Sequence, residues 1–111
     1  MVDLKLEDQP FPMTEAAYLE FEAQNERMHD FVEGIVYPRI GVSVRHSRVR
    51  TNAGIKLHTD IADNPDIFLV YMMRTKIPSR PIYRYPDIVI VSEKVQLYNN
   101  REDTITIQWC L

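Results

Sequence analysis

The chain has 111 residues, of which 45% are hydrophobic and 26% charged, and its formal net charge is −3. This size and composition are typical of one globular domain with a single core. The longest apolar run, residues 67–73, is shorter than the ~20 residues of a membrane span, and the N-terminus lacks the apolar stretch of a secretion signal. The lone cysteine, Cys110, excludes an internal disulfide, and no Cys/His spacing suits zinc. We therefore expect a cytoplasmic protein.

The charges are unevenly distributed along the chain. Residues 1–33 hold nine acidic and two basic residues, which gives −7, whereas residues 34–86 hold nine basic and three acidic residues, which gives +6. No carboxylate lies between Glu33 and Asp60, a stretch with four arginines and one lysine. Such a basic stretch is either a phosphate-binding face or a solvated helix face that complements the acidic N-terminal third.

The first predicted elements follow a lead-in. Residues 1–12 have no periodicity and contain two prolines, so we expect a flexible lead-in before one domain at residues 13–111. Thr14 is a suitable N-cap, and the apolar spacing after it predicts an amphipathic helix over residues 14–25. Residues 29–36 predict a strand with a bend or hairpin near Gly34.

A second helix is predicted after Ser43, which can act as its N-cap, and it ends at the turn that contains Asn64 and Pro65. Apolar residues four apart predict its buried stripe: Val49, Ala53, Leu57 and Ile61. Four polar residues lie around another face of the same helix: Arg45, Arg48, Asn52 and Lys56.

Three strands are predicted in the second half, at residues 67–73, 88–91 and 104–111. A linker with two prolines separates the first two, and the third alternates apolar and polar residues with a period of two. Helices and strands in this order predict an α/β (α+β) fold.

Asp87 is the most informative candidate site residue. It follows Pro86 and opens an apolar strand, so its carboxylate is expected to be held at the lip of a buried element. Nucleases use such an oxygen ligand to fix a divalent ion against a phosphate. A Pro-Asp step before a strand is also ordinary turn chemistry. His29 and His46 are either acid–base groups or surface and capping residues.

Four segments in order carry a resemblance to a known family. They are MTEAAYL at residues 13–19, HDFVEG at 29–34, RHSRV at 45–49 and YRYPDIVIV at 83–91. Together they resemble a large bacterial family of restriction endonucleases within the PD-(D/E)XK nuclease superfamily. The resemblance spans about residues 13–105, and its most recognisable part is the strand that begins with Pro86 and Asp87.

The resemblance implies a restriction-endonuclease-like core, which is a mixed sheet flanked by helices with a Mg²⁺ or Mn²⁺ site on one edge. It implies that Asp87 is a catalytic metal ligand and that Asp30 or Glu33 is the supporting carboxylate. The family usually has Gly-Glu where this chain has Gly34 and Ile35. The implied substrate is DNA, with phosphates held by Arg45, Arg48, Lys56 and Asn52.

The sequence departs from the family at its C-terminal end. Family members continue past the segment that resembles residues 103–106 into a strand with a second catalytic glutamate and a helix with a lysine. Residues 107–111 contain neither. We therefore expect a C-terminally truncated member whose sheet is incomplete at that edge and whose endonuclease activity is weak or lost. The alternatives are a non-catalytic nucleic-acid-binding remnant, a homo-oligomer that pairs through the terminal strand, or a fragment with little function.

Overall fold

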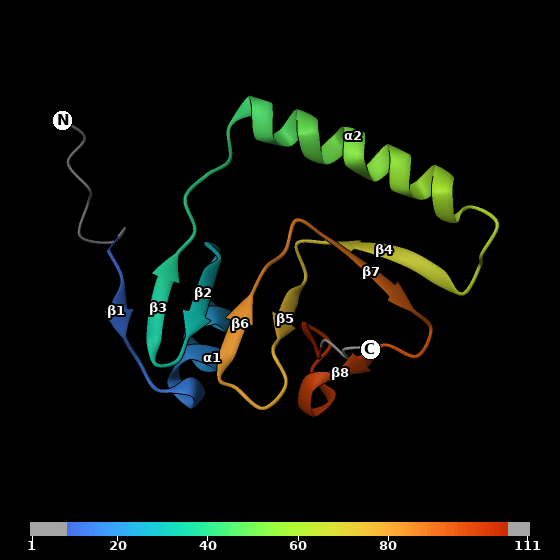
Figure 1. The fold of residues 1–111 in the computed structure, drawn as a ribbon. Coiled ribbons are helices and arrows are strands. Elements are labelled where there is room, and N and C mark those ends of the chain that lie inside the picture. The colour runs from blue at the N-terminus through green and yellow to red at the C-terminus, as the bar shows by residue number, and fades with distance from the viewer. Residues whose placement is uncertain (1–8, 107–111) are drawn as a thin grey trace.

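The structure is a computed structural model that describes residues 9–106 (Figure 1). Its elements are β1 (Phe11–Pro12), α1 (Glu15–Gln24), β2 (His29–Val32), β3 (Ile35–Pro38), α2 (Val44–Ile61), β4 (Ile67–Tyr71), β5 (Arg74–Lys76), β6 (Ile82–Arg84), β7 (Ile88–Ser92), β8 (Gln96–Leu97), a 3₁₀ turn (Tyr98–Asn100) and β9 (Thr104–Thr106). The predicted α+β class is confirmed. Neither helix in the described range is long and apolar enough to span a membrane.

Seven strands form a mixed sheet in the order β1-β3-β2-β6-β5-β9-β8, in which only β5 and β9 pair in parallel. The predicted hairpin at Gly34 is present, because β2 and β3 pair on either side of it. β1 lies inside the predicted lead-in. The terminal strand is described only over Thr104–Thr106, and the predicted pairing through residues 107–111 lies outside the described residues.

The core lies where α1 packs on the seven-stranded sheet. Four residues form the buried cluster: Tyr18, Phe31, Val36 and Tyr83. The Tyr18 ring stacks on Phe31 with centroids 4.8 Å apart and lies 5.4 Å from the Tyr83 ring. The Tyr18 hydroxyl donates to the carbonyl of His29 at 2.6 Å, so its buried polar atom is satisfied. We call α1 with the seven-stranded sheet the base.

A bent antiparallel ribbon leads out of the base. β5 pairs with β6 and β4 pairs with β7 in one unchanged register, so that Met72 lies opposite Asp87. The backbone N–H of Met72 donates to the carbonyl of Asp87 at 3.2 Å. Met72 has a φ of 53°, in the left-handed region, and Pro86 has no N–H to donate. The ladder therefore bends between the two sheets and presents Asp87 at the bend.

The helix α2 lies along β4, and together with β4 and β7 it forms what we call the arm (Figure 1). The Ser43 hydroxyl accepts a hydrogen bond from the N–H of His46 at 3.0 Å, so the predicted N-cap is confirmed. The predicted buried stripe is wrong for Val49, which is 62% exposed, and for Ala53. The buried residue of α2 is Gly54, which faces Tyr71 of β4.

The error has a geometric cause. A step of four residues advances about 400° around an α-helix, so a strict four-residue row drifts by ~40° at each step. The observed inner face alternates steps of three and four through Ser47, Arg50, Gly54, Leu57 and Ile61. The two C-terminal members of the predicted stripe belong to this face, and the two N-terminal members have rotated off it.

Candidate functional site

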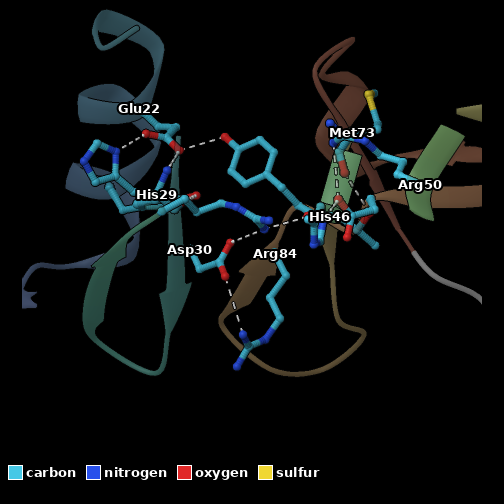
Figure 2. Close-up of polar contacts among 12 residues, drawn as sticks. Glu22, His29, Asp30, His46, Arg50, Met73 and Arg84 are labelled. Carbon is cyan, nitrogen blue, oxygen red and sulfur yellow. Dashed lines mark hydrogen bonds and ion pairs between the residues drawn. The ribbon is translucent and has the colours of Figure 1, made fainter. Parts of the chain in front are cut away.

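Asp87 contacts two side chains of α2 at the bend of the ribbon, His46 and Arg50, which are labelled in Figure 2. Its Oδ1 accepts a hydrogen bond from His46 Nε2 at 2.9 Å and another from Arg50 Nη1 at 3.3 Å. His46 and Arg50 are one helical turn apart, so both project from the same side of α2. These contacts tie the N-terminal half of the helix to the bend and place a carboxylate between an imidazole and a guanidinium group.

The electrostatics of this site favour an ionised carboxylate. The hydrogen bond from His46 lowers the pKa of Asp87, and the charges of His46, Arg50 and Arg39 lower it further, against the opposing effect of burial. The Asp87 side chain is 35% exposed, so solvent and small ligands can reach it. The site therefore presents a charged carboxylate at the surface at neutral pH.

Asp30 lies on β2, close to the same group of arginines. Its Oδ1 is 3.6 Å from Arg39 Nη1, and its Oδ2 is 3.5 Å from Arg84 Nη1 (Figure 2). Asp30 Oδ1 is buried and receives no hydrogen bond from the described residues. Arg39 Nη1 donates to the carbonyl of Tyr85 at 2.6 Å, two residues before Asp87. Arg39 thus connects Asp30 with the bend.

Glu33 lies elsewhere. It occupies the β2–β3 turn with a φ of 47°, and its backbone N–H donates to the carbonyl of Pro81 at the start of β6. Its carboxylate accepts a hydrogen bond from Arg80 Nε at 2.9 Å. Asp87 lies beyond the opposite end of β6, three residues after Arg84. The structure therefore does not bring Glu33 to Asp87 as a supporting carboxylate.

The donor set around Asp87 suits a divalent metal ion poorly. Mg²⁺ prefers a near-octahedral shell of oxygens and usually takes one or two carboxylates together with water. No three His, Cys, Asp or Glu side chains between residues 9 and 106 are grouped so that they could hold a metal ion. The one contacted oxygen of Asp87 already accepts hydrogen bonds from His46 and Arg50. These residues alone do not fit the Mg²⁺ or Mn²⁺ that the family resemblance implies.

The predicted nucleic-acid-binding residues do form one surface. Steps of three, four and four residues place them within a narrow arc of the outer face of α2, where all four are exposed: Arg45, Arg48, Asn52 and Lys56. Arg45 and Arg48 have no ion-pair partner among the described residues, whereas Lys56 pairs with Asp60 at 2.8 Å. The first half of the helix therefore offers two unneutralised guanidinium groups to an anionic partner.

Sequence reasoning missed Arg39, Arg50 and Arg84 as neighbours of the two aspartates. One signal was available, because His46 and Arg50 are four residues apart on a predicted helix and such pairs share a face. No sequence signal could have placed Arg39 or Arg84 beside Asp30, because each contact joins segments that only the folded sheet brings together.

His29 belongs to a buried network in the base and not to this site (Figure 2). Glu22 accepts hydrogen bonds from the backbone N–H of His29 at 2.7 Å and from the Tyr85 hydroxyl at 2.7 Å, and it contacts His29 Nδ1 at 2.8 Å. Burial, followed by the contact with Glu22, raises the pKa of Tyr85. The network joins α1 to β2 and to the end of β6, so its role is structural.

Comparison with known proteins gives a relative and no activity. The chain is 30% identical over 94 residues to the uncharacterized protein sll1609 of Synechocystis sp.. The alignment covers 85% of this chain and 53% of that protein, so the chain spans about half the length of the curated relative it matches. No family model matches the chain, and no solved structure matches it.

Proposed function

We propose that this protein is a nucleic-acid-binding member of the restriction-endonuclease-like class, with α2 holding DNA phosphates and Asp87 at the position of the class's metal-binding aspartate. The observation that carries the proposal is the contact of Asp87 with His46 and Arg50. It fixes an accessible carboxylate beside the basic half of an exposed helix. The four ordered sequence segments support the same class.

In that class the aspartate helps to bind Mg²⁺ or Mn²⁺ for hydrolysis of phosphodiester bonds. A single carboxylate is a poor site for these ions, because they require several oxygens. We therefore expect metal-dependent cleavage of DNA by this chain to be weak or absent unless another carboxylate joins Asp87. Binding of the DNA backbone does not depend on that carboxylate.

The binding proposal is tested by the salt dependence of the affinity for a labelled DNA duplex, measured by fluorescence anisotropy. Replacing both Arg45 and Arg48 by alanine should lower the slope of log K against log salt by about two, since each phosphate contact contributes about one. The matched control replaces Arg80 and Arg101, which pair with Glu33 and Asp103. The control variant has the same net charge as the α2 variant, because each loses two arginines, and it should keep the wild-type slope. Equal slopes in the wild type and the α2 variant would refute the proposal.

A second candidate function is a binding module without catalysis. It is favoured by the hydrogen bonds from His46 and Arg50 that Asp87 Oδ1 already accepts. Calorimetric titration with Mn²⁺ separates the candidates. Saturable binding that is lost in Asp87→Asn would support the endonuclease, whereas no binding in either protein would support the module.

A further inference from the structure

A cleft of about 330 Å³ lies where the end of α1 and the loop after it approach the bend of the ribbon. Its lining comes from residues between 22 and 28, from residues 72–74, and from Tyr85 and Asp103. Small-molecule sites in proteins begin at about this size. None of these residues belongs to α2, so the cleft is separate from the proposed DNA-binding face.

Arg74 places a buried cation in the lining of this cleft. Its side chain is 3% exposed, and its Nε donates to Thr104 Oγ1 at 2.7 Å. Nη2 lies 3.1 Å from Asp103 Oδ1 but donates no hydrogen bond to any residue between 9 and 106. Buried polar atoms are nearly always hydrogen-bonded, so this nitrogen calls for an acceptor from outside the chain. A carboxylate is the acceptor that matches a guanidinium group.

Asp103 can release Arg74 to such an acceptor. The Asp103 side chain is 55% exposed. Its Oδ1 also lies 3.3 Å from Arg101 Nε and accepts a hydrogen bond from the Thr104 hydroxyl at 3.0 Å. A ligand carboxylate can therefore take the place of Asp103 at Arg74 while Asp103 keeps its two other partners.

The cleft also offers a carboxylate to a cationic group. Three acidic and two basic residues line it: Glu22, Glu26, Asp103, Arg27 and Arg74. Both oxygens of Glu22 are already engaged by His29 and Tyr85. Glu26 is exposed and makes no hydrogen bond or ion pair with the described residues. Glu26 is therefore the acidic side chain that is available to a ligand.

Three methionines give the cleft an apolar wall. Met28, Met72 and Met73 line it, and Met28 is 37% exposed. Methionine side chains are flexible and polarizable, so they adapt their shape to an apolar group. The lining thus combines an anion-binding group, a cation-binding group and an apolar surface.

We propose that this cleft binds a free α-amino acid with an apolar side chain. Arg74 holds the carboxylate, Glu26 holds the ammonium group, and the methionines contact the side chain. A simple anion would leave Glu26 without a partner, and a simple cation would leave Arg74 Nη2 without an acceptor. This site does not depend on the proposed binding of nucleic acids.

The test is calorimetric titration of the full chain with L-leucine and with three analogues that each lack one feature. Leucinamide lacks the carboxylate, 4-methylpentanoate lacks the ammonium group, and glycine lacks the apolar side chain. We expect saturable binding of one L-leucine and at least ~10-fold weaker binding of each analogue, since each removes a charged contact or a buried apolar group. No saturable binding of L-leucine, or an analogue that binds as tightly, would overturn the proposal.

Two pairs of variants locate the ligand without disturbing the core. Met28→Trp should obstruct the cleft and weaken binding at least ~10-fold, whereas Val49→Trp, on the exposed face of α2, should bind as the wild type does. Glu26→Gln should also weaken binding about 10-fold, and Glu20→Gln on the exposed side of α1 should not. Melting followed by circular dichroism checks that all four variants are folded. Unchanged affinity in Met28→Trp would place the ligand elsewhere and overturn the proposal.

Asp103→Asn distinguishes the proposed exchange at Arg74 from a structural role of the ion pair. The variant lacks the charge that competes with the ligand carboxylate, so it should bind L-leucine about 2–5-fold more tightly than the wild type. Equal or weaker binding would overturn the assignment of Arg74 as the group that holds the carboxylate.

Discussion

The base and the arm bury their side chains very differently. In the base, Tyr18, Phe31 and Tyr83 are almost fully buried, and the Glu22 carboxylate accepts hydrogen bonds from His29 of β2 and from Tyr85, which follows β6. The arm and the loop that leads into it expose many large hydrophobic side chains: Ile40, Val42, Val44, Val49, Ile55, Phe68, Tyr71 and Ile90. The aromatic core therefore stabilises the base, whereas α2 packs mainly against β4 and is also held by its contacts with Asp87.

This difference separates stability from function. The candidate site lies where the arm meets the base, and four of its side chains come from the weakly packed helix: Arg45, His46, Arg48 and Arg50. Segments with few buried contacts are the ones that open first and that most often carry ligand-binding surfaces. Substitutions in the base should therefore affect folding, and substitutions on the outer face of the arm should affect binding.

The largest effect is expected from Tyr18→Ala. Removing this ring leaves a cavity between Phe31 and Tyr83 and also leaves the carbonyl of His29 without its donor. The free energy of unfolding should fall by about 3–5 kcal/mol. Val49→Ala on the outer face of α2 should change it by less than about 0.5 kcal/mol. Urea denaturation measures both, and comparable losses would contradict the proposed division between base and arm.

The next effect concerns the buried network of the base. Glu22→Gln keeps the size of the side chain but replaces an acceptor with a donor amide in a site where Tyr85 and His29 both present donors. The free energy of unfolding should fall by about 2–3 kcal/mol, the cost of leaving buried polar groups unsatisfied. Glu20→Gln is the matched control, because Glu20 lies on the exposed side of α1. If both variants melt alike, the network does not support the base.

The packing of α2 on β4 is tested at Gly54. A Cβ built there would lie 2.5 Å from the Tyr71 hydroxyl oxygen and 3.4 Å from the ring carbon that bears it. Gly54→Ala alone should change stability little, because the gain in helix propensity of about 1 kcal/mol is offset by displacement of the hydroxyl. In a Tyr71→Phe background the same substitution should stabilise by about 1 kcal/mol. A double-mutant cycle without coupling would place α2 away from Tyr71.

The smallest effect concerns the contact between arm and base at Asp87. The folded protein lowers the pKa of this carboxyl, chiefly through His46, so the contribution is present above the unfolded pKa of about 4 and is lost as pH falls below it. Because the side chains are partly exposed, Asp87→Asn should cost less than about 1 kcal/mol at pH 7. The difference from wild type should vanish near pH 2. A constant difference from pH 7 to pH 2 would contradict the assignment.

The sequence predicted the local features of the fold well. Both N-caps, the hairpin at Gly34 and the strand that follows Asp87 depend on short-range signals, and each is present. The run at residues 67–73 was harder, because nothing in its composition marks the left-handed Met72 at which the ribbon bends. The observed strand β4 therefore ends at Tyr71, two residues before the predicted end, and the chain continues as β5 in the other sheet.

The candidate site was only partly predictable. Asp87 and the face of Arg45 and Arg48 follow from local pattern, since each depends on one segment. The contacts of Asp87 with His46 and Arg50 could not be predicted, because they form only when α2 approaches a strand about forty residues further along the chain. The separation of Glu33 from Asp87 could be predicted only with the strand order known, because the two residues lie at opposite ends of β6. Long-range contacts of this kind leave no periodic signal in a single sequence.

The division between base and arm is tested most directly by amide hydrogen exchange with and without a saturating DNA duplex. The account predicts slow exchange in α1 and β2 whether or not DNA is present. It predicts faster exchange in α2 of the free protein and new protection of α2 and the start of β7 when DNA is added. Protection that appears on α1 or on the β2–β3 hairpin, with α2 unchanged, would contradict the account.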